Sequence, residues 1–280
     1  MFKKHILIAL AVAGTLAFAE PIERRAATNE FPTPPATVHL TAPMVIKAGT
    51  TFTPDQPYTR YDRGSGACKS SGEGGSADAV FHLEEGATIS RVVIGKDQME
   101  GIHCLGSCTI DHVYFEDVCE DAITILQTSG TSRINYGGGA QDKIVQHNGA
   151  GTVIINSFYA ENFGKLYRSC GNCKTTQYTR HVEVNDSWAV SGSALVGINS
   201  NYGDTAKIRN LQVSKVNSIC DKYTGNNNGK EPTKVGTGPD GTVRYHPVGI
   251  IHASRLTFAR LELPVQRVRY SLRVRQDYPG

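Results

Sequence analysis

The sequence predicts an all-β protein, folded as a right-handed, single-stranded parallel β-helix with coils of about 21–25 residues. The first observation is a repeat. Segments rich in Val, Ile and Thr begin at Thr88, Thr109, Thr131 and Thr152, at spacings of 21, 22 and 21 residues. The second is the Gly and Asn between these segments, which favours short strands joined by turns. Leucine-rich repeats share this period but need a recurrent Leu pattern, which is absent.

The expected strands follow the repeat along the chain. They cover 88–94, 109–115, 131–134 and 152–158, with looser copies at 181–188 and 207–213. Apolar residues at alternate positions would fill the interior of the stacked coils. No segment after the N-terminus has the length and period of an amphipathic helix, so helices are not expected to contribute to the fold.

The N-terminus has the features of a secretory signal peptide over residues 1–19. Basic residues precede a short apolar stretch, and Ala17–Ala19 forms a small-residue cleavage site. The apolar stretch is too short to span a membrane, so we expect a secreted, extracellular protein with no membrane partner. Residues 20–34 would be a short pro-segment or linker, in which Arg24–Arg25 is either a processing site or two solvated arginines.

Seven cysteines occur, and a secreted protein can hold them in disulfides. The odd count leaves one of them without a partner. Cys170 and Cys173 have the spacing of a zinc or thiol-redox pair, but no second pair of this kind accompanies them, so structural disulfides are favoured. Asn185–Ser187 is a formal N-glycosylation sequence, which predicts a glycoprotein.

The repeat predicts one β-helix domain over residues 35–242. Residues 243–280 contain seven Arg but no Lys or Cys, and show no coil period. This anomalous tail indicates either a gene-model artefact, such as a retained intron or frameshift, or a divergent basic end. The net charge of the whole chain is only +3, so no nucleic-acid partner is expected.

Charged residues occur at set points of the repeat. Glu120–Asp121 are adjacent carboxylates, and Lys143, Lys165 and Arg168 follow on later coils. Stacked strands are roughly 5 Å apart, so these groups can line one groove. Adjacent carboxylates suit a hard cation such as Ca²⁺, and Lys and Arg suit an anionic substrate. Each group alone is more often a solvated charge, but together and in this order they predict a site for an acidic polymer bridged by calcium.

Six segments in order carry a resemblance to the secreted pectate lyases of fungal type, polysaccharide lyase family 3. They are 92–95 (VVIG), 101–104 (GIHC), 116–122 (EDVCEDA), 142–152 (DKIVQHNGAGT), 164–173 (GKLYRSCGNC) and 199–206 (NSNYGDTA). The resemblance covers about 35 to 240. It implies a parallel β-helix and a calcium-dependent β-elimination of polygalacturonate, the backbone of de-esterified pectin. We expect the protein to act as a monomer.

The resemblance also implies roles for individual residues. Glu120–Asp121 match calcium ligands, and Glu100 stands where some relatives carry an aspartate ligand. Lys143, Lys165 and Arg168 match the catalytic and substrate-binding basic residues. These six residues form the expected site.

The expected chemistry is the removal of a weakly acidic proton. The C5 proton of galacturonate lies next to a carboxylate, and calcium on that carboxylate would stabilise the negative charge that develops. A basic residue must then accept the proton. The sequence favours Lys143 as this base and Lys165 and Arg168 as cations that neutralise the carboxylate, although Lys143 and Arg168 can exchange roles. A free Lys has a pKa of about 10.4, so an alkaline optimum is expected.

Two other functions stay open. Relatives carry a Lys where Leu126 stands, so the chain could retain a pectin-binding groove without turnover. A β-helix hydrolase acting on the same polymer is disfavoured, because hydrolysis needs a general acid carboxyl paired with a second carboxylate. Absorbance of the unsaturated product, with and without EDTA, separates the three functions.

Overall fold

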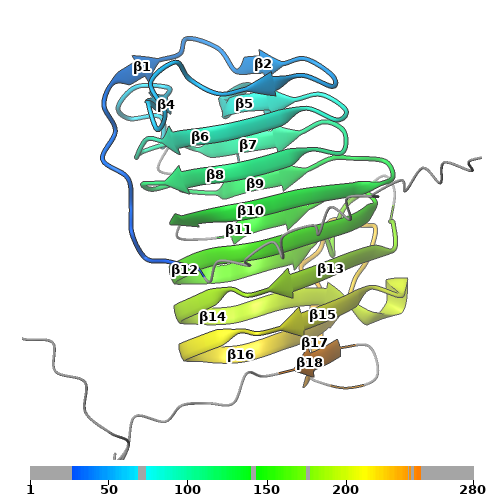
Figure 1. The fold of residues 1–280 in the computed structure, drawn as a ribbon. Helices are drawn as coiled ribbons and strands as arrows, with labels where there is room; N and C mark the ends of the chain where they lie inside the picture. Colours follow the sequence, from blue (N-terminus) through cyan, green and yellow to red (C-terminus); the bar gives the residue numbers. More distant parts are fainter. Residues whose placement is uncertain are drawn as a thin grey trace, which may run out of the picture. The chain divides into compact units, whose positions relative to one another are not determined.

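The computed structural model describes residues 27–68, 74–139, 143–174, 177–238, 240 and the backbone of 243–246. Short strands wind in successive coils that stack on one another (Figure 1). The coils make about seven turns, and consecutive coils pair parallel. The helices in the described ranges are two 3₁₀ turns, Ser76–Asp78 and Ser200–Tyr202. The predicted all-β, parallel β-helix is therefore confirmed.

The described strands follow one another along the chain as the coils do (Figure 1). They are β1 (Thr37–His39), β2 (Met44–Ile46), β3 (Thr51–Phe52), β4 (Arg60–Asp62), β5 (Ala79–Leu83), β6 (Thr88–Ile94), β7 (Glu100–Cys104), β8 (Thr109–Phe115), β9 (Asp121–Ile125), β10 (Thr131–Gly139), β11 (Lys143–His147), β12 (Gly151–Ser169), β13 (Arg180–Asn185), β14 (Trp188–Asn199), β15 (Thr205–Arg209), β16 (Gln212–Thr224), β17 (Thr233–Gly238) and β18 (Val243–His246).

The register of the coils agrees with the predicted repeat except at one step. Thr88 pairs with Thr109, and Thr131 pairs with Thr152, each 21 residues apart. Thr109, however, pairs with Arg133, which is 24 residues away rather than the predicted 22. A shift of two residues keeps the alternation of inward and outward side chains. The wrong spacing therefore leaves the predicted pattern of buried positions intact.

One corner of the coil is marked by a column of residues in the left-handed backbone conformation. Their φ angles lie between 49° and 53°, and the column consists of Arg91, His112, Tyr136, Ser157, Asp186 and Asn210. Beside this corner, amide side chains stack from coil to coil. Asn156 donates to Asn135 at 2.9 Å, and Asn185 donates to Asn156 at 3.0 Å. Asn185 is only 6% exposed, so the formal glycosylation sequence is closed to modification in the folded protein.

The interior of the coils is an apolar column, with Phe81, Phe115 and Phe158 among its largest buried side chains. At the C-terminal end, β17 pairs antiparallel with β16. β18 pairs parallel with β15 and continues the ladder to His246, four residues into the segment predicted as a tail. The rest of that tail, like the predicted signal peptide and residues 20–26, lies outside the described residues.

Three disulfides are present: Cys68–Cys119, Cys104–Cys108 and Cys170–Cys173. The prediction of structural disulfides is therefore confirmed, including the pair with the redox-like spacing. Cys220 is buried and free. Burial raises the pKa of its thiol to about 12, so the thiol stays protonated and unreactive at neutral pH.

Residues 27–36, which we call the strap, run along the outside of the coils before β1 (Figure 1, dark blue). The Ala27 N–H donates to the Asp186 carbonyl at 3.3 Å. The Phe31 ring packs edge-on against Tyr114, with 5.5 Å between the ring centroids. In the described part of the chain, no helix has the length and apolar character needed to cross a membrane.

Candidate active site

The predicted site residues lie on one face of the β-helix, which we call the groove face: β5, β7, β9, β11 and the C-terminal ends of β12, β14 and β16. Asp121 lies opposite Lys143, and Lys143 lies opposite Lys165. Three positions along the same strands, Gln146 lies opposite Arg168. Because neighbouring strands are roughly 5 Å apart, one polymer chain lying along this face can reach all of these positions.

A groove of about 530 Å³ is lined by Glu100, Glu120, Asp121 and Lys143. The Lys143 Nζ lies 3.5 Å from Glu120 Oε2 and 3.3 Å from Asp121 Oδ1. The adjacent carboxylates and the first basic residue, which are 22 residues apart between Asp121 and Lys143, thus meet across two strands. In this structure Lys143 is the counter-ion of the acidic pair.

Glu100 lies deeper in the groove than the acidic pair and is 5% exposed. Its Oε2 is 3.2 Å from His103 Nε2 and accepts a hydrogen bond from Thr124 Oγ1 at 3.4 Å. The neighbouring Gly101 permits the close approach of β7 to the next coil, since a Cβ at this position would lie 2.2 Å from the Ala122 carbonyl oxygen. Tight backbone packing therefore sets the height of Glu100 relative to the next coil.

Negative charge is crowded at the floor of the groove. Burial raises the pKa of Asp121 to about 7, with Lys143 opposing the shift and the charges of Glu100 and Glu120 adding to it. Carboxylate oxygens gathered in this way are the donors that Ca²⁺ prefers. The residues present thus fit a calcium ion, which Glu100, Glu120 and Asp121 would hold. Within the described ranges, no group of three or more His, Cys, Asp or Glu side chains forms a closed metal site by itself.

Arg168 extends from β12 toward the C-terminal coils. Its guanidinium carbon lies 3.9 Å from the centroid of the Tyr223 ring. The side chain crosses Gly197, where a Cβ would lie 3.0 Å from Arg168 Cδ. Arg168 is 8% exposed, and its buried Nη1 has no hydrogen-bond partner among the described residues. Burial lowers the pKa of Arg168, although the Tyr223 ring and Asp204 act in the opposite direction.

The Tyr223 ring is itself held by the antiparallel end of the β-helix. Its hydroxyl donates to Asp221 Oδ2 at 3.3 Å. On β17, Lys234 Nζ lies 2.7 Å from Asp221 Oδ1. The β16–β17 pair therefore fixes the aromatic ring that covers Arg168.

Buried polar residues support the turns next to the groove. Arg180 is fully buried and donates to the carbonyl oxygens of Gly149 and Asn148, both at 2.7 Å. Asp204 accepts hydrogen bonds from the backbone N–H groups of Arg180 and Asn199, both at 2.9 Å. Asp204 therefore has a structural role, as the sequence led us to prefer for the loop around it.

Four of the six predicted site residues line the groove, namely Glu100, Glu120, Asp121 and Lys143. The other two, Lys165 and Arg168, lie in register on the same face but outside the groove lining. Leu126 does line the groove. Sequence reasoning missed His103 and Tyr223. His103 belongs to the segment 101–104 and could have been found from its place in that motif, whereas Tyr223 lies in none of the motifs.

The fold and the groove define a parallel β-helix protein whose groove suits a cation and an anionic polymer. Residues 28–230 match the family model described as pectate lyase. The chain is 47% identical over 259 residues to pectate lyase E of Emericella nidulans, covering 88% of this chain and 97% of that relative. The chain therefore belongs to the pectate lyase family.

Two solved structures are also similar to the chain. One is a pectate lyase from Erwinia chrysanthemi in complex with tetragalacturonic acid, with a TM-score of 0.60 and 27% identity, covering 77% of this chain and 71% of that one. The other is a pectate lyase from Pectobacterium carotovorum, with a TM-score of 0.60 and 27% identity, covering 73% of this chain and 67% of that one.

Proposed function

We propose that this protein cleaves polygalacturonate, the de-esterified form of pectin, by calcium-dependent β-elimination. The observation that carries the proposal is the arrangement of charge on the groove face. Glu100, Glu120 and Asp121 converge with Lys143 in one groove, and Lys165 follows in register on the next strand. A polyanion lying along the coils would meet oxygen ligands for a shared cation at one end and fixed cations at the other.

The proposed reaction breaks the bond between C4 of one sugar and the glycosidic oxygen. A basic side chain takes the proton from C5, and the electron pair of that C–H bond forms a double bond between C4 and C5. The glycosidic oxygen leaves with the neighbouring sugar and gains a proton. When bound, calcium would withdraw charge from the substrate carboxylate next to C5 and so make the C5 proton more acidic.

Two observations support a division of roles among the basic residues. Lys143 is paired with Glu120 and Asp121, which suits a residue that orders carboxylates. Burial lowers the pKa of Arg168 and leaves its Nη1 without a partner in the described ranges, which supports Arg168 as the base. We therefore favour Arg168 over Lys143, the reverse of the preference drawn from the sequence. Lys165, in register with Lys143, would neutralise a substrate carboxylate.

The proposal is tested with polygalacturonate and the purified protein. Ultraviolet absorbance reports the unsaturated product, and a reducing-end assay on the same digest reports all chain breaks. Absorbance that appears with calcium and disappears with EDTA is expected. Reducing ends without absorbance would show a hydrolase instead. Arg168→Lys is expected to lower kcat by at least about 100-fold, in the range for loss of a general base, and Lys143→Ala to raise the calcium or substrate requirement.

One observation favours a second function, a pectin-binding protein without turnover. Leu126 lines the groove, at the position where the family resemblance implies a Lys. Such a protein would bind polygalacturonate in a calcium-dependent way and give neither absorbance nor reducing ends.

We further propose that the protein is secreted and acts as a monomer. The three disulfides support an oxidising compartment. Detection of the protein in culture medium, together with its elution volume in size-exclusion chromatography, tests both statements.

A further inference from the structure

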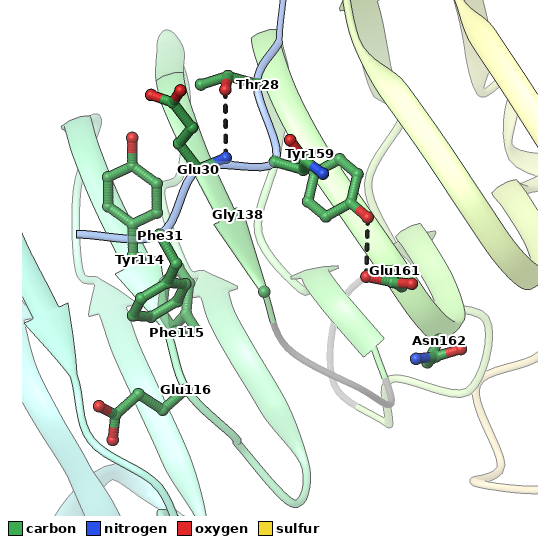
Figure 2. A pocket seen from close by; sticks show the side chains of 12 residues that line it. Thr28, Glu30, Phe31, Tyr114, Phe115, Glu116, Gly138, Tyr159, Glu161 and Asn162 are labelled. Atoms are coloured by element: carbon green, nitrogen blue, oxygen red, sulfur yellow. Dashed lines mark hydrogen bonds between the residues drawn. The ribbon is translucent and has the colours of Figure 1, made fainter. Parts of the chain in front are cut away.

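A second pocket lies away from the groove, between the strap and the strands β8, β10 and β12 (Figure 2). We propose that this pocket binds one ring of a neutral sugar chain and so anchors the protein on a neutral polysaccharide beside its pectin substrate. The pocket has a volume of about 300 Å³, at the lower end of the range for small-molecule sites. This size suits a single sugar ring better than an extended segment of polymer.

The pocket exists because one coil lacks a side chain at this point. Gly138 pairs with Tyr114 on one side and with Tyr159 on the other, so the three positions stand in one column. The tyrosines are two strand spacings apart, roughly 9–10 Å, with only backbone between them. A Cβ at Gly138 would already lie 3.2 Å from the Tyr159 carbonyl oxygen. The column therefore forms a slot with an aromatic ring on each side.

The aromatic walls of the slot are held in place by further rings. Phe31 of the strap packs against Tyr114, with 5.5 Å between centroids, and Trp188 packs against Tyr159, with 5.1 Å between centroids. Figure 2 shows Phe31 and Tyr114 on one side of Gly138 and Tyr159 on the other. Rigid aromatic side chains offer apolar contact area at low entropic cost. The C–H faces of a sugar ring are the natural partner for such surfaces, because its hydroxyl groups point outward from the ring edge.

The polar rim of the slot consists of acceptors and one amide. Glu161 accepts a hydrogen bond from the Tyr159 hydroxyl at 2.7 Å, and Asn162 lies beside it. Glu116 is paired with Arg60, whose Nε donates to it at 3.0 Å, so the charge of Glu116 is already balanced. Carboxylate and amide oxygens with spare lone pairs are acceptors for hydroxyl donors. Glu161 already accepts one hydroxyl, and its remaining acceptor sites suit others.

The charge of the pocket argues against the polymer that fits the groove. Glu30, Glu116 and Glu161 line it, and no Lys or Arg does so among the described residues. A uronate would meet like charge here, which costs binding energy. A neutral sugar meets only acceptors and aromatic faces. The two sites therefore select different chains.

The pocket and the groove face different directions on the same coils. Tyr159 and Lys165 both belong to β12, but the chain bends between them at Asn162, which has a φ of +55°. A neutral chain held in the slot would thus leave the groove open to pectin. The proposed anchor raises the local concentration of enzyme on a mixed polysaccharide without entering the catalytic chemistry.

Binding is tested by calorimetry with oligosaccharides of glucose, xylose, mannose or galactose, and with oligogalacturonate in EDTA as the anionic comparison. At least one neutral probe is expected to bind. Tyr159→Ala should weaken it by about tenfold or more, while Tyr159→Phe retains the ring and the affinity. Glu161→Gln tests the rim, with Glu84→Gln, an exposed carboxylate elsewhere, as its matched control. Product formation on soluble polygalacturonate should be unchanged in all of these variants.

A folding defect in Tyr159→Ala is covered by Phe31→Ala, which trims the strap at a residue that is 44% exposed. This variant should also weaken the neutral probe. The proposal is overturned if no neutral probe binds at millimolar concentration, or if both variants bind as the unmodified protein does. Binding of an oligoarginine peptide that is lost in the same variants, with no neutral probe bound, would assign a cationic ligand and also overturn it.

Discussion

Replacement of Tyr223 tests whether the antiparallel end of the β-helix positions the catalytic arginine. The guanidinium of Arg168 lies 3.9 Å from the Tyr223 ring centroid, and Arg168 is 8% exposed. A desolvated cation–π contact of this kind contributes about 2 kcal/mol. If the whole contribution serves to position Arg168, Tyr223→Leu lowers kcat/KM by roughly 30-fold, since about 1.4 kcal/mol corresponds to tenfold in rate.

The conservative variant separates the ring from the hydroxyl. The hydroxyl of Tyr223 makes one long hydrogen bond to Asp221, at 3.3 Å. Tyr223→Phe should therefore cost less than about threefold, in line with the small net value of such a bond. Because the ring favours the charged form of Arg168, its loss lowers the pKa of Arg168. The alkaline limb of the kcat–pH profile should then move to lower pH in Tyr223→Leu and stay in place in Tyr223→Phe.

The assay is the initial rate of ultraviolet absorbance on polygalacturonate with saturating calcium, measured across alkaline pH, with a thermal unfolding curve for each variant. Tyr178→Leu is the matched control, because Tyr178 lies 5.8 Å from the guanidinium of Arg180, a looser contact outside the groove. The reasoning fails if Tyr223→Leu keeps kcat/KM within about threefold, or if Tyr223→Phe falls as far as Tyr223→Leu.

The remaining predictions concern stability. His147 has a pKa lowered by burial from 6.5 to about 3, so unfolding takes up a proton below pH 6.5 and stability falls as the pH drops toward 3, by on the order of 3 kcal/mol at pH ~4.5. Urea midpoints of His147→Gln should depend less on pH over this range, and equal slopes in both proteins would contradict the assignment. Replacing both Cys68 and Cys119 by Ser removes a closure of 51 residues, worth about 4 kcal/mol in the chain-entropy model, and should lower the urea midpoint more than loss of the Cys104–Cys108 pair, which spans four residues. Gly101→Ala would place a Cβ 2.2 Å from a carbonyl oxygen and should cost about 1–3 kcal/mol by denaturation; no loss would show that β7 and β9 can move apart.

The fold could be predicted because its local and global patterns agree. The strand segments that begin at Thr88, Thr109 and Thr152 are β-branched, recur at similar spacing and alternate in polarity, and each becomes a described strand or lies within one. The one wrong spacing, from Thr109 to Arg133, arises because turn lengths vary from coil to coil. Sequence periodicity constrains such turns weakly, whereas the alternation within a strand is fixed by the pleat.

The candidate site could be predicted only in part, for a related reason. Glu120 and Asp121 meet Lys143 because register places neighbouring coils together, and that follows from the repeat. Arg168 departs from this rule, since its long side chain crosses Gly197 toward Tyr223 instead of entering the groove. Its direction depends on the absence of a Cβ on one strand and a ring on the strand after it. No motif in the sequence marks that arrangement.

The most direct test of the central claim is the calcium dependence of unsaturated product formation by the unmodified protein and by Asp121→Asn. Asp117→Asn is the matched control, because Asp117 is outside the groove lining. Product absorbance should vanish in EDTA and return with calcium, and Asp121→Asn should need at least about tenfold more calcium, as expected when a charged ligand is lost. Product that forms equally well in EDTA, or an unchanged calcium requirement in Asp121→Asn, would contradict the account.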